Sequence, residues 1–278
     1  MSRKRPSRWR PALINLGVIV LLLSAVSFLP PDTSLAERQK AGFIKLCVPV
    51  SYPPFVTGDA AQPGFDVELM TRIAEGLGLR LAVNTLPTIG QDFNPRNWLL
   101  TRAQCDLIAG GVADTLQTRG FLQTLPTGVE TGWVAVSADG RLPEQGATIA
   151  VMPGSSGLDR LALSGWLRAD GYVARPVYDL PALAEMLASG GAQAAILERF
   201  VADQLHQMLP DSVLFWPPQD KLMHYQMALG MWKGDDTLRR AIAAEMDRLA
   251  TSGALAALQE KYGLGGTLPE AADGSPEG

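Results

Sequence analysis

The chain has 278 residues, of which 47% are hydrophobic and 19% are charged, and it contains 28 glycines and 20 prolines. This is an ordinary globular composition, and the length allows one large domain or two of about 100 to 150 residues, without room for a kinase or cyclase module. Residues 1–36 hold five of the 24 basic residues and one of the 28 acidic residues, so the rest of the chain has a net charge of −8. Such an acidic body argues against nucleic acid as a partner.

The amino terminus has the layout of an export signal. A basic cluster between Arg3 and Arg10 precedes an apolar stretch over residues 12–29, and two prolines and the pattern Ser34-Leu35-Ala36 follow. This order predicts a signal peptide over residues 1–36, cleaved after Ala36. The alternative is an uncleaved membrane anchor, because about 18 apolar residues can just span a bilayer. In both cases the body of the chain lies outside the cytoplasm.

The two cysteines lie in or beside apolar runs. Cys47 belongs to the run 43–50, and Cys105 directly precedes the run 106–110; both runs are typical of buried strands in a parallel sheet. An exported chain keeps its disulfides, so a Cys47–Cys105 bond is predicted if the two strands are neighbours; the alternative is two buried free thiols. Without a CxxC motif and with only two histidines, neither a zinc site nor a cofactor is expected.

The first half of the body alternates apolar runs with segments of helical spacing. The expected elements are a strand at 43–50, a rigid turn at 52–55, a helix from 64–66 to 76–78, a strand at 80–86, a short helix at 98–104 and a strand at 106–110. This alternation is the repeating unit of α/β proteins. Gly110 and Gly111 end the last strand and let a ligand approach the backbone at the edge where open α/β sheets bind ligands.

The second half continues the pattern. The expected elements are strands at 131–137 and 147–152, helices at 158–167 and 181–189, strands at 192–197 and 225–232, helices at 236–250 and up to Lys261, and a disordered tail over 265–278. A Gly-Ser-Ser turn precedes the helix at 158–167, where free N–H groups favour an anion, although an ordinary N-cap has the same pattern. Glu198 emerges at the end of a buried strand, at the same kind of edge.

In this order the segments resemble the periplasmic solute-binding proteins of family 3, the polar amino-acid receptors of ABC importers. The resemblance covers residues 43–264, and its strength lies in the order and spacing of motifs that are not specific one by one. The motifs are Tyr52-Pro53-Pro54-Phe55, Gly64-Phe65-Asp66-Val67-Glu68-Leu69, Cys105-Asp106-Leu107-Ile108-Ala109-Gly110-Gly111 with Thr115 and Arg119, Val151-Met152-Pro153-Gly154-Ser155-Ser156, Lys233-Gly234-Asp235, Ser252-Gly253-Ala254-Leu255 and Lys261-Tyr262-Gly263.

The resemblance implies the two-lobed α/β fold of type II periplasmic binding proteins. Each lobe would be a mostly parallel sheet flanked by helices, and two strands near residues 130–134 and 224–228 would cross between the lobes. Lobe 1 would comprise residues 40–132 plus 227–264, and lobe 2 residues 133–226. A ligand would be trapped between the lobes as they hinge shut.

The resemblance also implies how a ligand's carboxylate is held. Arg119 would fork onto the carboxylate with the Thr115 hydroxyl beside it, since a planar guanidinium matches a carboxylate in a way that Lys cannot. Ser155 and Ser156 would add donors from lobe 2. The alternative for Arg119 is a solvated position on its helix. The loop before Arg119 is one residue longer than is usual in the family.

Further ligand-binding positions follow from the same resemblance. Tyr52 would lie against the ligand with Trp98 or Phe93 as a second wall, unless Tyr52 only packs its turn. Glu198 stands where the family usually has an Asp that pairs with the ligand's ammonium, so the charge is kept but the reach is longer. Ala113 stands where the family often has Ser. These departures leave the identity of the ligand open.

We therefore expect a periplasmic receptor that captures a small carboxylate-bearing solute, most simply an amino acid, and delivers it, as a monomer, to an ABC permease. One alternative is an accessory or sensory protein of the same fold that docks on an exported partner such as a quinoprotein dehydrogenase, through residues 88–98. A third is an enzyme, because cyclohexadienyl dehydratases share this fold and an enclosed Glu198 could donate a proton.

Overall fold

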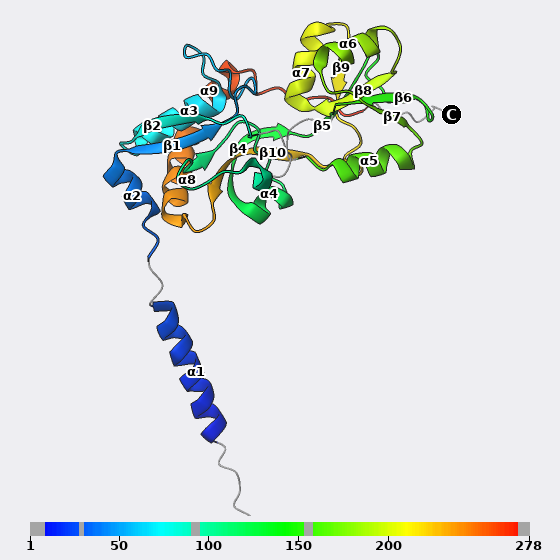
Figure 1. Cartoon of the computed structure of the whole chain (residues 1–278). Coiled ribbons are helices and arrows are strands. Elements are labelled where there is room, and N and C mark those ends of the chain that lie inside the picture. The colour runs from blue at the N-terminus through cyan, green and yellow to red at the C-terminus, as the bar shows by residue number, and fades with distance from the viewer. Residues whose placement is uncertain (1–8, 28–30, 90–94, 153–157, 272–278) are drawn as a thin grey trace, which may run out of the picture. The chain divides into compact units, whose positions relative to one another are not determined.

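The computed structural model describes residues 9–27, 31–89, 95–152 and 158–271 (Figure 1). By its contacts the chain divides into two units, residues 1–33 and 34–278. The first unit contains the helix α1 (Trp9–Ser27). Within the described ranges, no helix combines the length and apolarity needed to cross a membrane. The export signal remains a prediction.

The second unit begins with α2 (Ser34–Ala41), so the expected cleavage point after Ala36 falls inside a helix. The Ser34 hydroxyl accepts a hydrogen bond from the Leu238 N–H at the start of α8 (Asp236–Thr251), at 3.3 Å. Cleavage after Ala36 would remove this contact. The position at which the signal is cleaved therefore decides whether the hydrogen bond between Ser34 and the start of α8 is kept.

The first sheet has the strand order β2-β1-β3-β10-β4. Its strands β2, β1 and β3 are parallel, whereas β10 is antiparallel to both β3 and β4. The strands are β1 (Phe43–Val48), β2 (Arg80–Thr85), β3 (Leu107–Ile108), β4 (Leu122–Thr131) and β10 (Tyr225–Trp232). This sheet is thus mixed, with its parallel half as expected from the sequence.

Alternation along β1 divides the core of the first sheet between its two faces. Ile44, Leu46 and Val48 join a cluster that contains residues of α3 (Phe65–Gly76), α8 and α9 (Ala254–Lys261). Cys47 points to the other face, where it forms the predicted disulfide with Cys105, with their Cα atoms 5.4 Å apart. The bond follows from the register, because Cys47 pairs with Ile108 on the neighbouring strand β3.

The second sheet has the order β7-β6-β8-β5-β9, with β7, β6 and β8 parallel and β5 antiparallel to both β8 and β9. The strands are β5 (Trp133–Ser137), β6 (Thr148–Val151), β7 (Val173–Pro176), β8 (Ala194–Glu198) and β9 (Val213–Phe215). One face packs against α6 (Leu180–Ala188) and α7 (Arg199–Met208), and the other against α5 (Arg160–Ala169). Both sheets confirm the α/β class, although each is mixed rather than mostly parallel.

The chain passes from the first sheet to the second at Gly132, between β4 and β5, and returns between β9 and β10. A Cβ at Gly132 would lie only 3.0 Å from the Trp216 ring, so the crossing point is tightly packed. The expected helix at 98–104 is wrong: the structure has a short 3₁₀ turn, η1 (Pro95–Trp98), followed by turns.

Residues 265–271 differ from the expected disordered tail. They pair with the second sheet through an isolated parallel bridge between Glu270 and Trp216. Residues 272–278 lie outside the described ranges.

Candidate functional site

A cavity of about 520 Å³ lies between elements of the two sheets. Its wall combines the loop and first turn of α4 (Leu116–Phe121), the first turn of α5, and the start of β10 with the residues before it. The lining residues are Asp114, Thr115, Leu116, Gln117, Arg119, Asp159, Leu161, Met223, His224, Tyr225 and Gln226. Two of the residues predicted from the sequence, Thr115 and Arg119, therefore face this space.

Arg119 lines the cavity, and its guanidinium forms an ion pair with Asp114. Its Nε lies 2.9 Å from Asp114 Oδ1, and its Nη2 donates to the Asp114 carbonyl at 3.4 Å. Asp114 is fixed in turn by the Thr124 hydroxyl at 2.5 Å. The side chain of Arg119 is 55% exposed, and the buried position one residue earlier is taken by Thr118. The Arg119 side chain is thus more than half exposed, and Asp114 orients it.

Thr115 is the N-cap of α4, and its hydroxyl oxygen accepts the Thr118 N–H at 3.1 Å. Replacing Thr115 with Ala is expected to lower the free energy of unfolding by about 1 kcal/mol, because a cap hydrogen bond is lost. Thr115→Ser keeps the cap and serves as the matched control. Chemical denaturation measures both; equal losses in the two variants would contradict the capping role.

Glu198 is fully buried at the end of β8 and caps α7. Its carboxylate accepts the Thr131 hydroxyl at 2.5 Å and the backbone N–H groups of Phe200 and Val201 at 3.0 and 3.2 Å. Among the described residues, none forms an ion pair with it within 4 Å. Burial raises the pKa of Glu198 from 4.5 to about 7, although these hydrogen bonds favour the charged form. Glu198 is therefore a desolvated carboxylate without an ion pair within 4 Å among the described residues, and the adjacent, buried Arg199 interacts with it electrostatically at longer range.

Tyr52 approaches Glu198 from the first sheet. Burial raises the pKa of Tyr52 well above its usual value, and the charge of Glu198 raises it further. The Tyr52 hydroxyl is buried, and its interaction with the Glu198 carboxylate includes a hydrogen bond that also raises the pKa of Tyr52. Phe55, in the same turn as Tyr52, packs edge-on against Phe200 of α7, with ring centroids 4.6 Å apart. Two buried polar groups, one from each sheet's half of the unit, thus face each other.

A second buried carboxylate shapes the loop beside Tyr52. Asp66 Oδ2 accepts the Gly110 N–H at 2.8 Å, and burial raises the pKa of Asp66 from 3.8 to about 7. Gly110 has φ +75°, and a Cβ there would lie 2.5 Å from the Pro49 ring, so only glycine fits. Asp66 and Gly110 together fix the glycine loop under the Tyr52 ring.

Tyr52 and Glu198 are not among the residues that line the cavity of about 520 Å³, and the remaining predicted site residues lie elsewhere or outside the described ranges. Trp98 is 1% exposed and packs in the cluster around the disulfide, so it is not among the residues that line this cavity. Ala113 is buried and pairs with Met227. Phe93, Ser155 and Ser156 fall outside the described residues.

Sequence reasoning missed the cavity residues Asp159, Leu161 and 223–226. Asp159 has the sequence signal of a helix N-cap, because it is an Asp before an apolar-periodic segment. In the structure it accepts the N–H groups of Leu161 and Ala162, both at 2.9 Å. Residues 224–226 fall in the crossing expected near 224–228, but their place on the cavity wall depends on how β10 pairs with β4.

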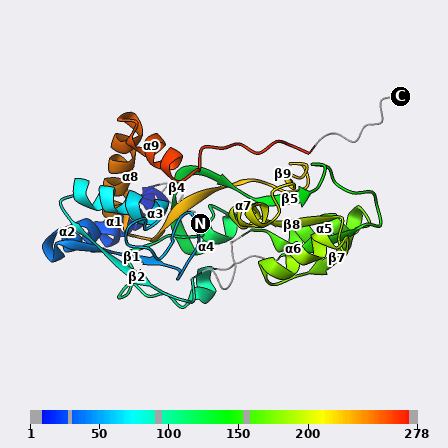
Figure 2. The ribbon, with the colours of Figure 1, turned by 90° about the horizontal axis from the view of Figure 1, so that it is seen from above.

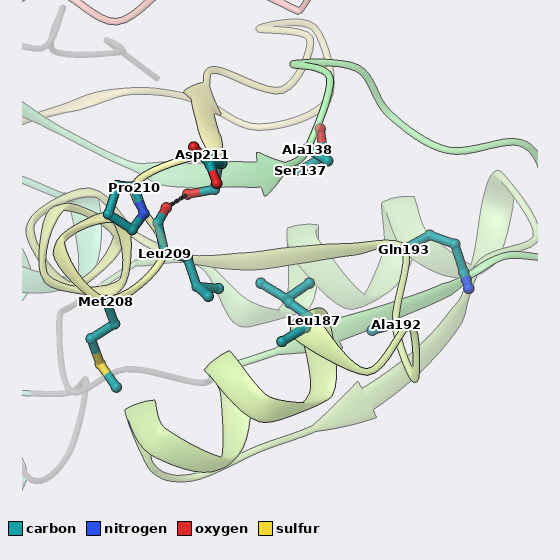
Figure 3. A pocket seen from close by; sticks show the side chains of 11 residues that line it. Ser137, Ala138, Leu187, Ala192, Gln193, Met208, Leu209, Pro210 and Asp211 are labelled. Atoms are coloured by element: carbon teal, nitrogen blue, oxygen red, sulfur yellow. Dashed lines mark hydrogen bonds between the residues drawn. The ribbon is translucent and has the colours of Figure 1, made fainter.

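A second cavity, of about 300 Å³, lies in the second sheet's half of the unit, between the ends of α6 and α7 (Figure 3). Leu187, Met208 and Leu209 surround it, and the Ser212 hydroxyl donates to the Leu209 carbonyl at 2.7 Å. Its lining is mainly apolar and contains no residue predicted from the sequence. The charged and polar groups gather instead at the cavity between the sheets. Within the described ranges, no group of three or more His, Cys, Asp or Glu residues could hold a metal ion.

The sequence profile of the bacterial extracellular solute-binding proteins, family 3, matches residues 44–265. The chain belongs to this family. No curated protein matches the chain in a sequence search.

Solved structures of family 3-like proteins share the fold. The P235GK mutant of the arginine-binding protein from T. maritima is 25% identical, with a TM-score of 0.59, and the match covers 82% of this chain and 98% of that one. The substrate-binding protein of an ABC uptake transporter from Streptococcus pneumoniae, with bound histidine, is 19% identical, with a TM-score of 0.61 and coverages of 83% and 96%. An ancestral amino acid-binding protein, a precursor of cyclohexadienyl dehydratase, is 19% identical, with a TM-score of 0.60 and coverages of 82% and 99%.

The two sheets are therefore the two lobes of a periplasmic binding protein fold. The first lobe is the part built on the first sheet, and the second lobe is the part built on the second. The cavity lies between residues of both lobes, where such a fold encloses its solute.

Proposed function

We propose that this chain is a periplasmic receptor that captures an ammonium-bearing solute, most simply an amino acid, between its lobes. It is exported by its amino-terminal signal, acts as a monomer and delivers the solute to an ABC permease. The observation that carries the proposal is the fully buried Glu198 carboxylate, which faces Tyr52 across the lobe boundary and forms no ion pair within 4 Å among the described residues. An ammonium group would supply the missing charge and hydrogen-bond donors.

The cavity wall supports the rest of the recognition. Arg119 keeps N–H groups beyond those that Asp114 engages, and these suit the carboxylate of the same solute. Three large apolar side chains on the wall are strongly exposed: Leu116 at 84%, Leu161 at 83% and Met223 at 68%. They come from both lobes and from the return crossing. We infer that the solute carries an apolar side chain which covers them.

Thermal-shift screening tests the proposal, because a ligand that binds only the folded protein raises the melting temperature. The panel contains amino acids with apolar and with polar side chains, each beside its deaminated acid and its decarboxylated amine. We expect the largest shift from an apolar amino acid and smaller shifts from its two analogues. If no ammonium-bearing compound shifts the melting temperature, the proposal is wrong.

Arg119→Lys is expected to weaken the solute found in this screen by at least about tenfold, since a forked donor becomes a point charge. Calorimetry with the intact amino acid and with its decarboxylated amine separates the effects. A loss confined to the amino acid assigns its carboxylate to Arg119. Equal losses for both compounds would remove Arg119 from carboxylate recognition.

A second candidate function is an enzyme in which Glu198 donates a proton. The pKa of about 7 favours it, and one structural neighbour is a precursor of cyclohexadienyl dehydratase. The family and the other neighbours named above are binding proteins, and we propose that this chain is one too. Incubation with prephenate or arogenate, followed by chromatography of the products, decides the question: turnover would establish the enzyme.

A further inference from the structure

The carboxyl-terminal segment 265–271 joins the first lobe to the second. It leaves the first lobe at Leu264, which is buried in the cluster of α3, α8 and α9. It then runs from α9 to the side of β9 (Figure 2). There the Pro269 carbonyl accepts the Trp216 N–H, and the Ala271 N–H donates to the Trp216 carbonyl, both at 2.8 Å. The segment thus adds main-chain hydrogen bonds to the edge of the second sheet.

Side chains fix the segment on the second lobe as well. Leu268 packs against the core cluster that contains residues of α6 and α7, and Ala271 packs against the cluster on the other face of the sheet. Glu270 accepts a hydrogen bond from Gln219 Nε2 at 2.7 Å. Only residues 265–267 separate the anchor on the first lobe from the anchor on the second, so the connection has little slack.

Arg199 connects this segment to the crossing strand β4. It is the first residue of α7 and is 5% exposed. Its Nη1 donates to the Glu130 carbonyl near the end of β4 at 2.9 Å, and its Nη2 donates to the Gly266 carbonyl. The guanidinium also lies over the Trp216 ring, 5.8 Å from the centroid. One buried cation thus holds a hinge strand, the second lobe and the carboxyl-terminal segment together.

We propose that residues 265–271, held by Arg199, are a strap that limits how far the two lobes open. Two crossing strands alone leave a hinge free to rotate, whereas a third, short connection restricts the rotation. Opening the lobes widely would break the hydrogen bonds of Trp216 and pull Leu268 from its cluster. Most of the strap lies beyond the region that matches the family, which ends at residue 265. The proposal does not depend on which solute binds.

Distance measurements by pulsed electron spin resonance test the strap without any ligand. Spin labels are placed at Glu75→Cys on the first lobe and Ala188→Cys on the second, both exposed positions, while the native cysteines stay in their disulfide. A chain ending at Leu264 lacks the strap, and a chain ending at Ala271 is the matched control. We expect longer and more widely distributed distances in the chain ending at Leu264 only. Identical distributions in the two chains would overturn the proposal.

A second variant covers the case in which the shortened chain does not fold. Eight Gly and Ser residues inserted between Gly265 and Gly266 leave both anchors in place and add about 15 Å of reach. We expect the same broadening, and faster hydrogen exchange at the Trp216 amide. Arg199→Met should broaden the distribution less, with the exposed Arg168→Met as its control. An unchanged distribution in the chain with the insertion would contradict the strap, whether or not the thermal screen finds a solute.

Discussion

Glu198→Gln is expected to weaken an amino-acid ligand by ten- to a hundredfold at pH 8. The neutral amide keeps the size of the side chain but cannot pair with an ammonium, and a hydrogen bond to a charged group is worth about 1.5 to 3 kcal/mol. The deaminated analogue has no ammonium to lose, so its affinity should fall less or rise. Calorimetry on both proteins with both compounds gives the four affinities. Equal losses for the two compounds would show that Glu198 does not recognise the ammonium.

The pH dependence of binding gives a second readout of the same group. Only ionised Glu198 attracts an ammonium, and its pKa in the unliganded protein is about 7. Affinity for the amino acid should therefore rise about tenfold for each pH unit between about 5 and 7, and level off above pH 7. In Glu198→Gln this slope should disappear. A wild-type affinity that falls as pH rises would contradict the assignment.

The stability of the unliganded protein should run in the opposite direction. Glu198 binds its proton more tightly in the folded state than in the unfolded chain, where its pKa is near 4.5, so folding favours the protonated form. The unfolding free energy should fall as pH rises from about 4.5 to 7, by about 3 kcal/mol, and stay level above pH 7. Glu198→Gln removes this contribution.

Asp66, whose pKa is also raised to about 7, should contribute a similar slope, and Asp66→Asn is the control. Denaturation at a series of pH values separates the two carboxyl groups. A wild-type protein that gains stability between pH 5 and 7 would show that neither group titrates as described.

Much of the fold follows from local pattern. The apolar runs around Cys47 and Cys105 are strands β1 and β3, and their parallel pairing brings the two sulfur atoms together. The helix that starts at Phe65 ends at Gly76, as its apolar spacing and glycines predict. These features depend on residues that are close in the sequence and on the parallel pairing of neighbouring strands in an α/β sheet. Both can be inferred from the sequence.

The missed features depend on contacts that a sequence does not display. Strand β4 contains Pro126 and Gly128, which normally interrupt a strand, yet it pairs with β10 over most of its length across a register shift. The polar, acid-rich segment around Glu270 reads as a tail because its partner, Trp216, lies far away in the sequence. Arg119 lines the cavity, but its ion pair with Asp114 depends on the local conformation of the loop before α4, which the sequence does not display.

Replacing Cys47 and Cys105 with Ala is expected to lower the free energy of unfolding by about 4 kcal/mol through loop entropy alone. The disulfide closes a loop with a sequence separation of 58, and breaking it enlarges the ensemble of the unfolded chain. Both residues are fully buried beside Trp98 and Trp232, so each Ala adds a smaller cost for lost packing.

The single variants separate the effect of the disulfide from the effect of side-chain packing, because each one already removes the whole disulfide bond. Cys47→Ala and Cys105→Ala should each lose nearly as much stability as the double variant, and a reducing agent should destabilise the wild type but none of the three. Denaturation with and without reductant gives all the values. If the two single losses add up to that of the double variant, the cysteines contribute separately as packed side chains. The disulfide would then not stabilise the pairing of β1 with β3.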